Sequence, residues 1–80
     1  MRINVLLFAS YADALGRPSV ELELPDDATV DDLVRHLRAT PGASRLPARP
    51  LVALDHAYAR PDQPLAGATE IAVIPPVAGG

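Results

Sequence analysis

The 80-residue chain contains no cysteine, no lysine and no tryptophan. Without cysteine it cannot form a disulfide, act through a thiolate nucleophile or hold a metal through thiolate ligands. This composition favours a reducing compartment, so we expect a cytoplasmic protein. Without lysine, all seven positive charges are arginines, and the N-terminus is the only amine that could accept an acyl group.

Long hydrophobic runs are also missing. The apolar run at residues 5–9 is too short for a signal-peptide core, and far below the roughly 20 residues of a membrane span. A net charge of -3 argues against nucleic-acid binding, which depends on neutralising phosphates. We therefore expect no membrane and no nucleic-acid partner. The 49% of hydrophobic residues is enough for the core of one small domain, which we expect to span residues 1–80.

The first half of the chain reads as two strands joined by a short helix. Residues 2–8 are aliphatic with little polar alternation, which predicts a strand buried on both faces. Residues 10–15 predict one or two helical turns, with Ser10 as the cap and Gly16 as the stop. Residues 19–24 alternate between apolar and acidic side chains, which predicts a half-exposed strand.

The clearest predicted helix begins after Thr29, a favourable N-cap. Acidic residues occupy its first turn and arginines its last, as the helix dipole favours. The sequence Thr40-Pro41-Gly42 ends it. The apolar stripe at helical spacing consists of Val30, Leu33, Val34 and Leu37.

The second half of the chain predicts short strands. We expect a loop at residues 43–50, a strand at 51–54, a turn-rich connection at 58–64 with a minor strand near Tyr58, and a last strand at 70–74. This order predicts an α+β fold, in which a mixed sheet of four to five strands has one main helix packed across one face.

Polar residues offer few catalytic arrangements. His36 and His56 fall on different predicted elements, and we interpret both as surface residues rather than metal ligands. A triad could be drawn from the histidines with Ser10, Asp13 and Asp55, but no nucleophile elbow supports it. Turn and helix-start chemistry explains the acidic residues that could attract a cation: Asp26, Asp27, Asp31 and Asp32. We expect no active site within this chain.

The C-terminal sequence IAVIPPVAGG is the most informative segment. Pro75 and Pro76 lack N–H donors, so they end a strand and keep the chain extended. Residues 75–80 then reach about 20 Å at roughly 3.3 Å each. Gly79 and Gly80 have no side chains, so a narrow channel could admit them. The alternative interpretation is an ordinary frayed terminus.

The sequence resembles the β-grasp sulfur carriers, which are ubiquitin-like, and within them most closely the small subunits of molybdopterin synthase. Two departures are visible: Asp55 stands where asparagine is common, and residues 67–70 replace the usual Asp-Gly-Asp-Glu turn. The resemblance covers nearly the whole chain, and its most specific part is IPPVAGG. The matching segments are residues 4–16, the helix start Thr29-Val30 with Leu33 and Leu37, residues 52–55, Pro64-Leu65 and residues 74–80.

The resemblance implies a role for the tail in molybdenum cofactor biosynthesis. A partner related to ubiquitin-activating enzymes would use ATP to adenylate the carboxylate of Gly80, which sulfur transfer would convert to a thiocarboxylate. The tail would then enter the large subunit of molybdopterin synthase, in a heterotetramer, and give sulfur to the pterin precursor. The tail contacts would be Pro75, Pro76, Val77, Ala78 and Gly79. The chain itself would bind no cofactor or metal, and Phe8 is a candidate for the docking surface, although it could equally be a core residue.

Other functions remain open. Carriers that serve thiamine or cysteine synthesis also end in two glycines. A ubiquitin-like modifier would instead join Gly80 to lysines on target proteins, and a plain interaction module would carry an inert tail.

Overall fold

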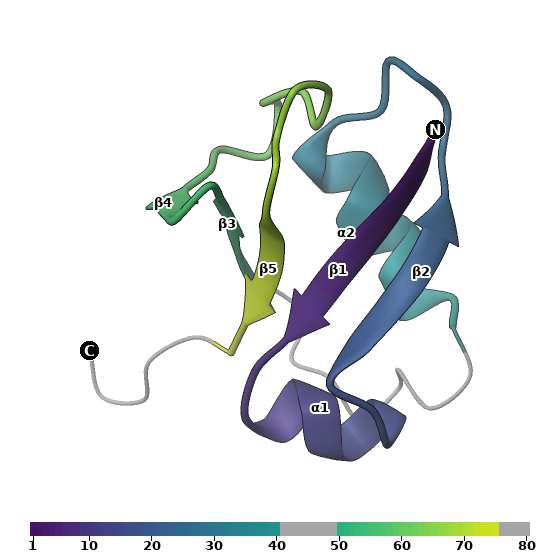
Figure 1. Cartoon of the computed structure of the whole chain (residues 1–80), viewed down its shortest axis with the longest axis vertical. Helices are drawn as coiled ribbons and strands as arrows, with labels where there is room; N and C mark the ends of the chain where they lie inside the picture. Colours follow the sequence, from purple (N-terminus) through teal and green to yellow (C-terminus); the bar gives the residue numbers. More distant parts are fainter. Residues whose placement is uncertain (41–49, 76–80) are drawn as a thin grey trace.

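A computed structural model of the protein describes residues 1–40 and 50–75. This part of the chain forms a five-stranded sheet and two helices (Figure 1). The strands are β1 (Arg2–Leu7), β2 (Ser19–Glu23), β3 (Leu51–Leu54), β4 (Ala57–Tyr58) and β5 (Ile71–Ile74). The helices are α1 (Ser10–Leu15) and α2 (Val30–Arg38).

The sheet is mixed and has the strand order β2-β1-β5-β3-β4. β1 and β5 run parallel, with Val5 opposite Ile71, whereas the other neighbouring pairs are antiparallel. The last strand of the sequence is therefore the middle strand of the sheet. The α+β β-grasp architecture predicted from the sequence is confirmed, including the minor strand near Tyr58.

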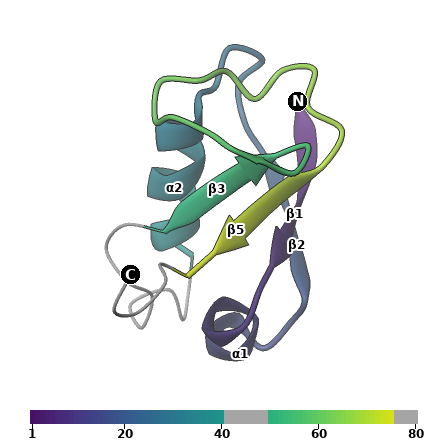
Figure 2. The same ribbon diagram turned by 90° about the vertical axis from the view of Figure 1, so that its left-hand side faces the viewer.

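Helix α2 packs across one face of this sheet (Figure 2). Its N-terminus has a capping box: the Asp32 backbone N–H donates to the Thr29 hydroxyl, and the Thr29 N–H donates to the Asp32 carboxylate at 2.9 Å. Leu33 and Leu37 are fully buried. The helical stripe read from the sequence is thus the surface that closes the core, with Val34 at its half-buried edge.

The core lies between α2 and the inner face of the sheet. Side chains alternate along each strand, so the inner face carries every second residue. The buried inner-face residues are Val5, Leu7, Val20, Val52, Leu54, Ile71 and Val73. Tyr11 of α1 closes one end of this core and is also fully buried.

Two local predictions were wrong. Ser10 is the first residue of α1 rather than its cap; Ala9 is the cap residue, with φ 50° and ψ -124° and no capping side-chain bond. β1 is not buried on both faces, because α2 covers one face only and Leu6 on the other is half exposed. Gly16 does end α1, in the left-handed conformation, as predicted.

The hairpin between β3 and β4 explains why aspartate can replace the family's usual asparagine at position 55. Asp55 and His56 form its two-residue turn, and both have positive φ (51° and 73°), as a type I′ turn requires. Aspartate and asparagine are the residues that most readily adopt this conformation after glycine. Neither helix of the described part of the chain is long and apolar enough to cross a membrane.

Candidate docking face and tail exit

The predicted tail starts at the end of β5. Ile74 pairs with Leu51 of β3, and Pro75, the last described residue, is half buried. The other five predicted tail residues, Pro76, Val77, Ala78, Gly79 and Gly80, lie outside the described residues. The structure therefore describes the strand and the surroundings from which the tail leaves.

The outer face of the sheet, opposite α2, is apolar near this exit. The alternation that sends Val5, Leu7 and Val73 into the core sends Leu6 and Ile74 to the outer face. The register then places matching residues of β3 and β4 beside them. We call this set the sheet-face patch: Leu6, Phe8, Leu51, Ala53, Tyr58, Ala72 and Ile74.

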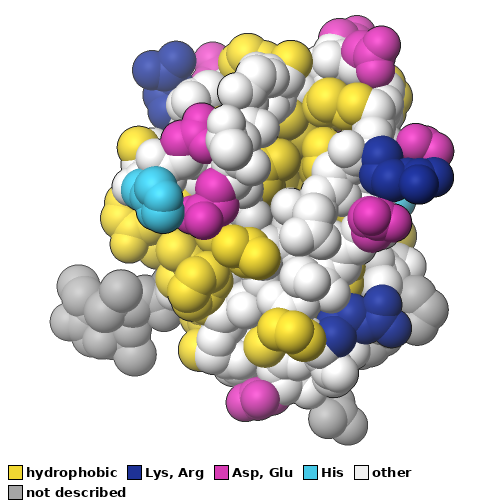
Figure 3. Space-filling view, in the orientation of Figure 1, with side chains coloured by type: hydrophobic (Ala, Val, Ile, Leu, Met, Phe, Trp, Pro, Cys, Tyr) yellow, Lys and Arg dark blue, Asp and Glu magenta, His cyan; other side chains and the backbone are white. Residues whose placement is uncertain are grey.

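The middle of the sheet-face patch is formed by two small side chains. Ala53 and Ala72 are paired neighbours, and although they lie on the outer face they are only 7% and 3% exposed. The larger side chains around them are more exposed to solvent; Tyr58, for example, is 70% exposed. In Figure 3, hydrophobic side chains gather over β3, β4 and the C-terminal end of β5. A contiguous exposed apolar surface of this kind is typical of a protein-binding site.

Phe8 belongs to this patch and not to the core. Its N–H donates to the Val73 carbonyl at 3.2 Å, which continues the pairing of β1 with β5 and brings Phe8 level with Ile74. Its carbonyl accepts from the Tyr11 N–H at 3.1 Å, so both sides of the residue are anchored. The ring is 47% exposed. Of the two interpretations of Phe8, the structure supports the surface one.

The far end of the outer face is polar. Glu21 and Glu23 of β2 and Asn4 of β1 are exposed there. At the β3–β4 turn, one carboxylate oxygen of Asp55 accepts the backbone N–H groups of Thr69 and Glu70, at 2.8 and 2.7 Å. These bonds fasten the hairpin to the segment that leads into β5. Asp55 is thus a structural residue.

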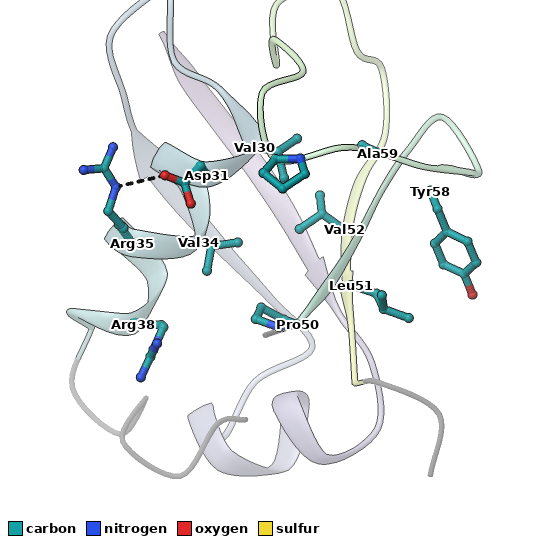
Figure 4. A pocket seen from close by; sticks show the side chains of 11 residues that line it. Val30, Asp31, Val34, Arg35, Arg38, Pro50, Leu51, Val52, Tyr58 and Ala59 are labelled. Atoms are coloured by element: carbon teal, nitrogen blue, oxygen red, sulfur yellow. Dashed lines mark ion pairs between the residues drawn. The ribbon is translucent and has the colours of Figure 1, made fainter. Parts of the chain in front are cut away.

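A separate groove of about 550 Å³ lies between α2 and β3 (Figure 4). Val30, Val34 and Val52 line it, and the ion pair between Asp31 and Arg35 (3.5 Å) stands on its helical side. Asp32 also pairs with Arg35. The pKa of Asp32 is held below its ordinary value, mainly because the Thr29 N–H donates to its carboxylate.

The side chains considered for catalysis do not assemble. His36 and His56 are both exposed, and His56 Nδ1 lies 3.2 Å from the Glu70 carboxylate. Among the described residues, no cluster of histidine and acidic side chains has the arrangement of a metal site. Ser10, Asp13 and Asp55 are all exposed, and Asp55 already serves the hairpin. Of the sheet-face patch, only Phe8 was predicted from the sequence, because the run at residues 5–9 is apolar at every position and does not show which face the helix leaves uncovered.

Among the side chains that the structure describes, the Tyr11 hydroxyl is the one buried polar group without a hydrogen-bond partner. Burial raises the pKa of its hydroxyl. Its ring fills the space under α1 and holds this short helix to the core. Because the Tyr11 N–H donates to the Phe8 carbonyl, the buried ring also helps to hold Phe8 in place. We assign Tyr11 this structural role and no catalytic one.

Known proteins are similar to this chain over nearly its whole length. A molybdopterin synthase sulfur carrier subunit from Dictyostelium discoideum is 35% identical, over 99% of this chain and 96% of that protein. The crystal structure of the small archaeal modifier protein 1 from Haloferax volcanii superposes with a TM-score of 0.79 at 28% identity, covering 95% of this chain and 98% of that one. A complex of subunits 1 and 2 of the molybdopterin-converting factor from Helicobacter pylori has a chain of the same fold, with a TM-score of 0.67 at 21% identity and full coverage of both chains. The model of the ThiS family matches residues 5–80. The chain belongs to the ThiS family.

Proposed function

We propose that this protein is the sulfur-carrier subunit of a molybdopterin synthase. The observation that carries the proposal is identity of 33–35% to proteins named as molybdopterin synthase sulfur carrier subunits, over at least 96% of their length. The proposed carrier group is the carboxyl of Gly80, within the 75–80 tail. Pro75 and Pro76 direct the tail away from β5, and Val77, Ala78 and Gly79 contact the partner.

The chemistry of the tail follows from what a carboxylate needs. A carboxylate is a poor acyl donor until it carries a leaving group. In the proposed cycle, the Gly80 carboxylate attacks the α-phosphate of ATP on an adenylating partner and releases pyrophosphate. Hydrosulfide then attacks the acyl carbon and displaces AMP, which leaves a thiocarboxylate. We also propose a cytoplasmic location, which the cysteine-free composition supports.

The large subunit supplies the substrate site and the acid–base groups in this proposal. The sheet-face patch gives it a place to bind, because the patch lies at the strand end from which the tail departs. The Helicobacter pylori complex of subunits 1 and 2 supports a partnership of this kind. We further propose that two copies of each subunit form a heterotetramer. A thiamine or cysteine pathway is the alternative for the same carrier chemistry.

A protein modifier is the second candidate function. The likeness to the small archaeal modifier protein 1 favours it, since that chain has the same fold over nearly its whole length. The two functions share activation of Gly80 and differ in what attacks it. A sulfur nucleophile makes a thiocarboxylate, whereas a lysine amine on another protein makes an isopeptide bond.

Intact-mass spectrometry separates the two functions. The protein is incubated with ATP, a sulfide source and the adenylating enzyme. We expect a mass gain equal to one sulfur minus one oxygen, and none in a variant that lacks Gly80. Sulfuration of the pterin precursor should then require the large subunit. A carrier that gains no sulfur, or sulfuration that persists without Gly80, contradicts the proposal; adducts on lysines of other proteins support the modifier.

A further inference from the structure

The outer edge of β2 carries main-chain groups that point away from the sheet. In an antiparallel pair, alternate residues direct their N–H and C=O groups to the neighbouring strand and to the opposite side. The Leu7 N–H donates to the Pro18 carbonyl at 2.8 Å and the Leu24 N–H to the Met1 carbonyl at 2.9 Å. The even-numbered residues of this strand therefore face β1. Ser19, Glu21 and Glu23 each turn one donor and one acceptor outward.

The opposite edge of the sheet does not offer such a row. β4 has only two residues, and the chain beyond it turns back to the helix, where the Asp31 N–H donates to the Pro61 carbonyl at 2.9 Å. Pro50 and Pro61 flank the short strands there, and neither has an N–H group to donate. Of the two edges in the described part of the sheet, the β2 edge is the one suited to an additional strand.

The side chains on the β2 edge determine which kind of additional strand could pair with it. Glu21 and Glu23 are exposed on the same face, two residues apart, so an incoming strand meets carboxylates at these two positions and Ser19 at the third. Arg2 of β1 lies opposite Glu23, which leaves Glu21 as the carboxylate without a basic residue opposite it in β1. A second copy paired edge to edge would set these carboxylates against each other, which is unfavourable. A basic side chain opposite each carboxylate is favourable.

We propose that the β2 edge binds an extended, basic segment of a partner protein as a sixth strand. Main-chain bonds to Ser19, Glu21 and Glu23 hold the segment, and arginine or lysine at its alternate positions pairs with the two carboxylates. This surface lies at the opposite sheet edge from β4, and its use does not depend on sulfur transfer by Gly80.

Peptide titration followed by NMR tests this proposal on the full chain. The probes are a seven-residue peptide with arginine alternating with valine, its glutamate counterpart, and the arginine peptide with a central proline. We expect saturable binding of the arginine peptide, roughly tenfold tighter than the glutamate peptide from two cross-strand charge pairs. The amide protons of Ser19, Glu21 and Glu23 should become protected from solvent exchange, while those of Val20 and Leu22, already bonded to β1, should not change.

Matched charge variants make the test decisive. Glu21→Arg should weaken binding of the arginine peptide several-fold and strengthen that of the glutamate peptide. Asp62→Arg, with the same change in net charge in the loop after β4, should alter neither by more than about twofold. Equal effects of the two variants, or equal binding of the proline peptide, would show non-specific attraction and overturn the proposal. Edge pairing of the protein with itself in place of the peptide would overturn it as well.

Discussion

Replacement of Ala9 by glycine should stabilise the protein. Ala9 has φ 50° and ψ -124°, a region that a residue with a Cβ rarely adopts. A residue held in such a region costs about 1–3 kcal/mol. Glycine removes this strain but gives the unfolded chain more freedom, which costs roughly 0.5–1 kcal/mol. We expect Ala9→Gly to raise the free energy of unfolding by about 1 kcal/mol.

Thermal and urea unfolding measure this change. For a domain of this size, a gain of about 1 kcal/mol raises Tm by roughly 4–8 °C, and the urea midpoint should increase with an unchanged m-value. Ala14→Gly is the matched control, because Ala14 lies inside α1 and packs against the core. The same substitution there should lower stability by about 1 kcal/mol.

Two interactions keep Ala9 in its strained backbone conformation. The Asp13 N–H donates to the Ala9 carbonyl at 3.2 Å, and the buried Tyr11 ring fixes α1 two residues further on. If Ala9→Gly lowers stability as much as Ala14→Gly does, the strain argument is refuted. The β1–α1 junction would then be relaxed in solution.

Three further predictions concern single side chains. Asp55→Asn should leave stability within about 0.5 kcal/mol, because an amide oxygen can accept the same two N–H bonds, while Asp55→Ala should lose about 2 kcal/mol in urea unfolding. Phe8→Ala should weaken binding of the large subunit by roughly 1–3 kcal/mol in calorimetry with little change in Tm; a matching loss of Tm would place the ring in the core instead. The Asp32 pKa is lower in the folded protein than its ordinary value of 3.8, so its stabilising effect is present above that pH and is lost as pH falls through the lowered pKa. Asp32→Asn should accordingly be less stable than the parent at neutral pH and equal to it in strong acid, and a constant difference at all pH values would contradict this cause.

The elements with a strong period were predictable from the sequence. The capped helix after Thr29 and the alternating strand with Glu21 and Glu23 appear where the pattern placed them, because local bonding and periodicity determine both. The minor strand near Tyr58 was also expected, and its turn residues have the positive φ that an Asp-His pair only moderately favours.

The outer face of the sheet was not predictable in the same way. The run around Leu6 and Leu7 is apolar at every position, so the sequence alone does not show which face the single helix leaves uncovered. Strand order decides this, and it depends on the long-range pairing of Val5 with Ile71. The prediction of Ser10 as the cap was wrong because the chain leaves β1 through Ala9, which occupies the cap position. Ala9 has a strained backbone conformation that residue preferences do not predict. The placement of the tail residues 76–80 remains a prediction.

The position of β5 relates the sheet-face patch, where a partner would bind, to the start of the C-terminal tail. Because β5 is the middle strand, the strands on both sides of it contribute to the surface at its end: Phe8 follows β1, and Leu51 begins β3. A partner that covers this surface contacts both neighbours of the strand whose last residue is Ile74. Across the strands, the tail after Pro75 therefore starts in the middle of the area that such a partner covers, at the end of the sheet where β5 stops. A tail attached to edge strand β2 or β4 would start at the border of any site on this face. The central position of β5 thus brings the start of the tail close to any partner that binds the sheet-face patch.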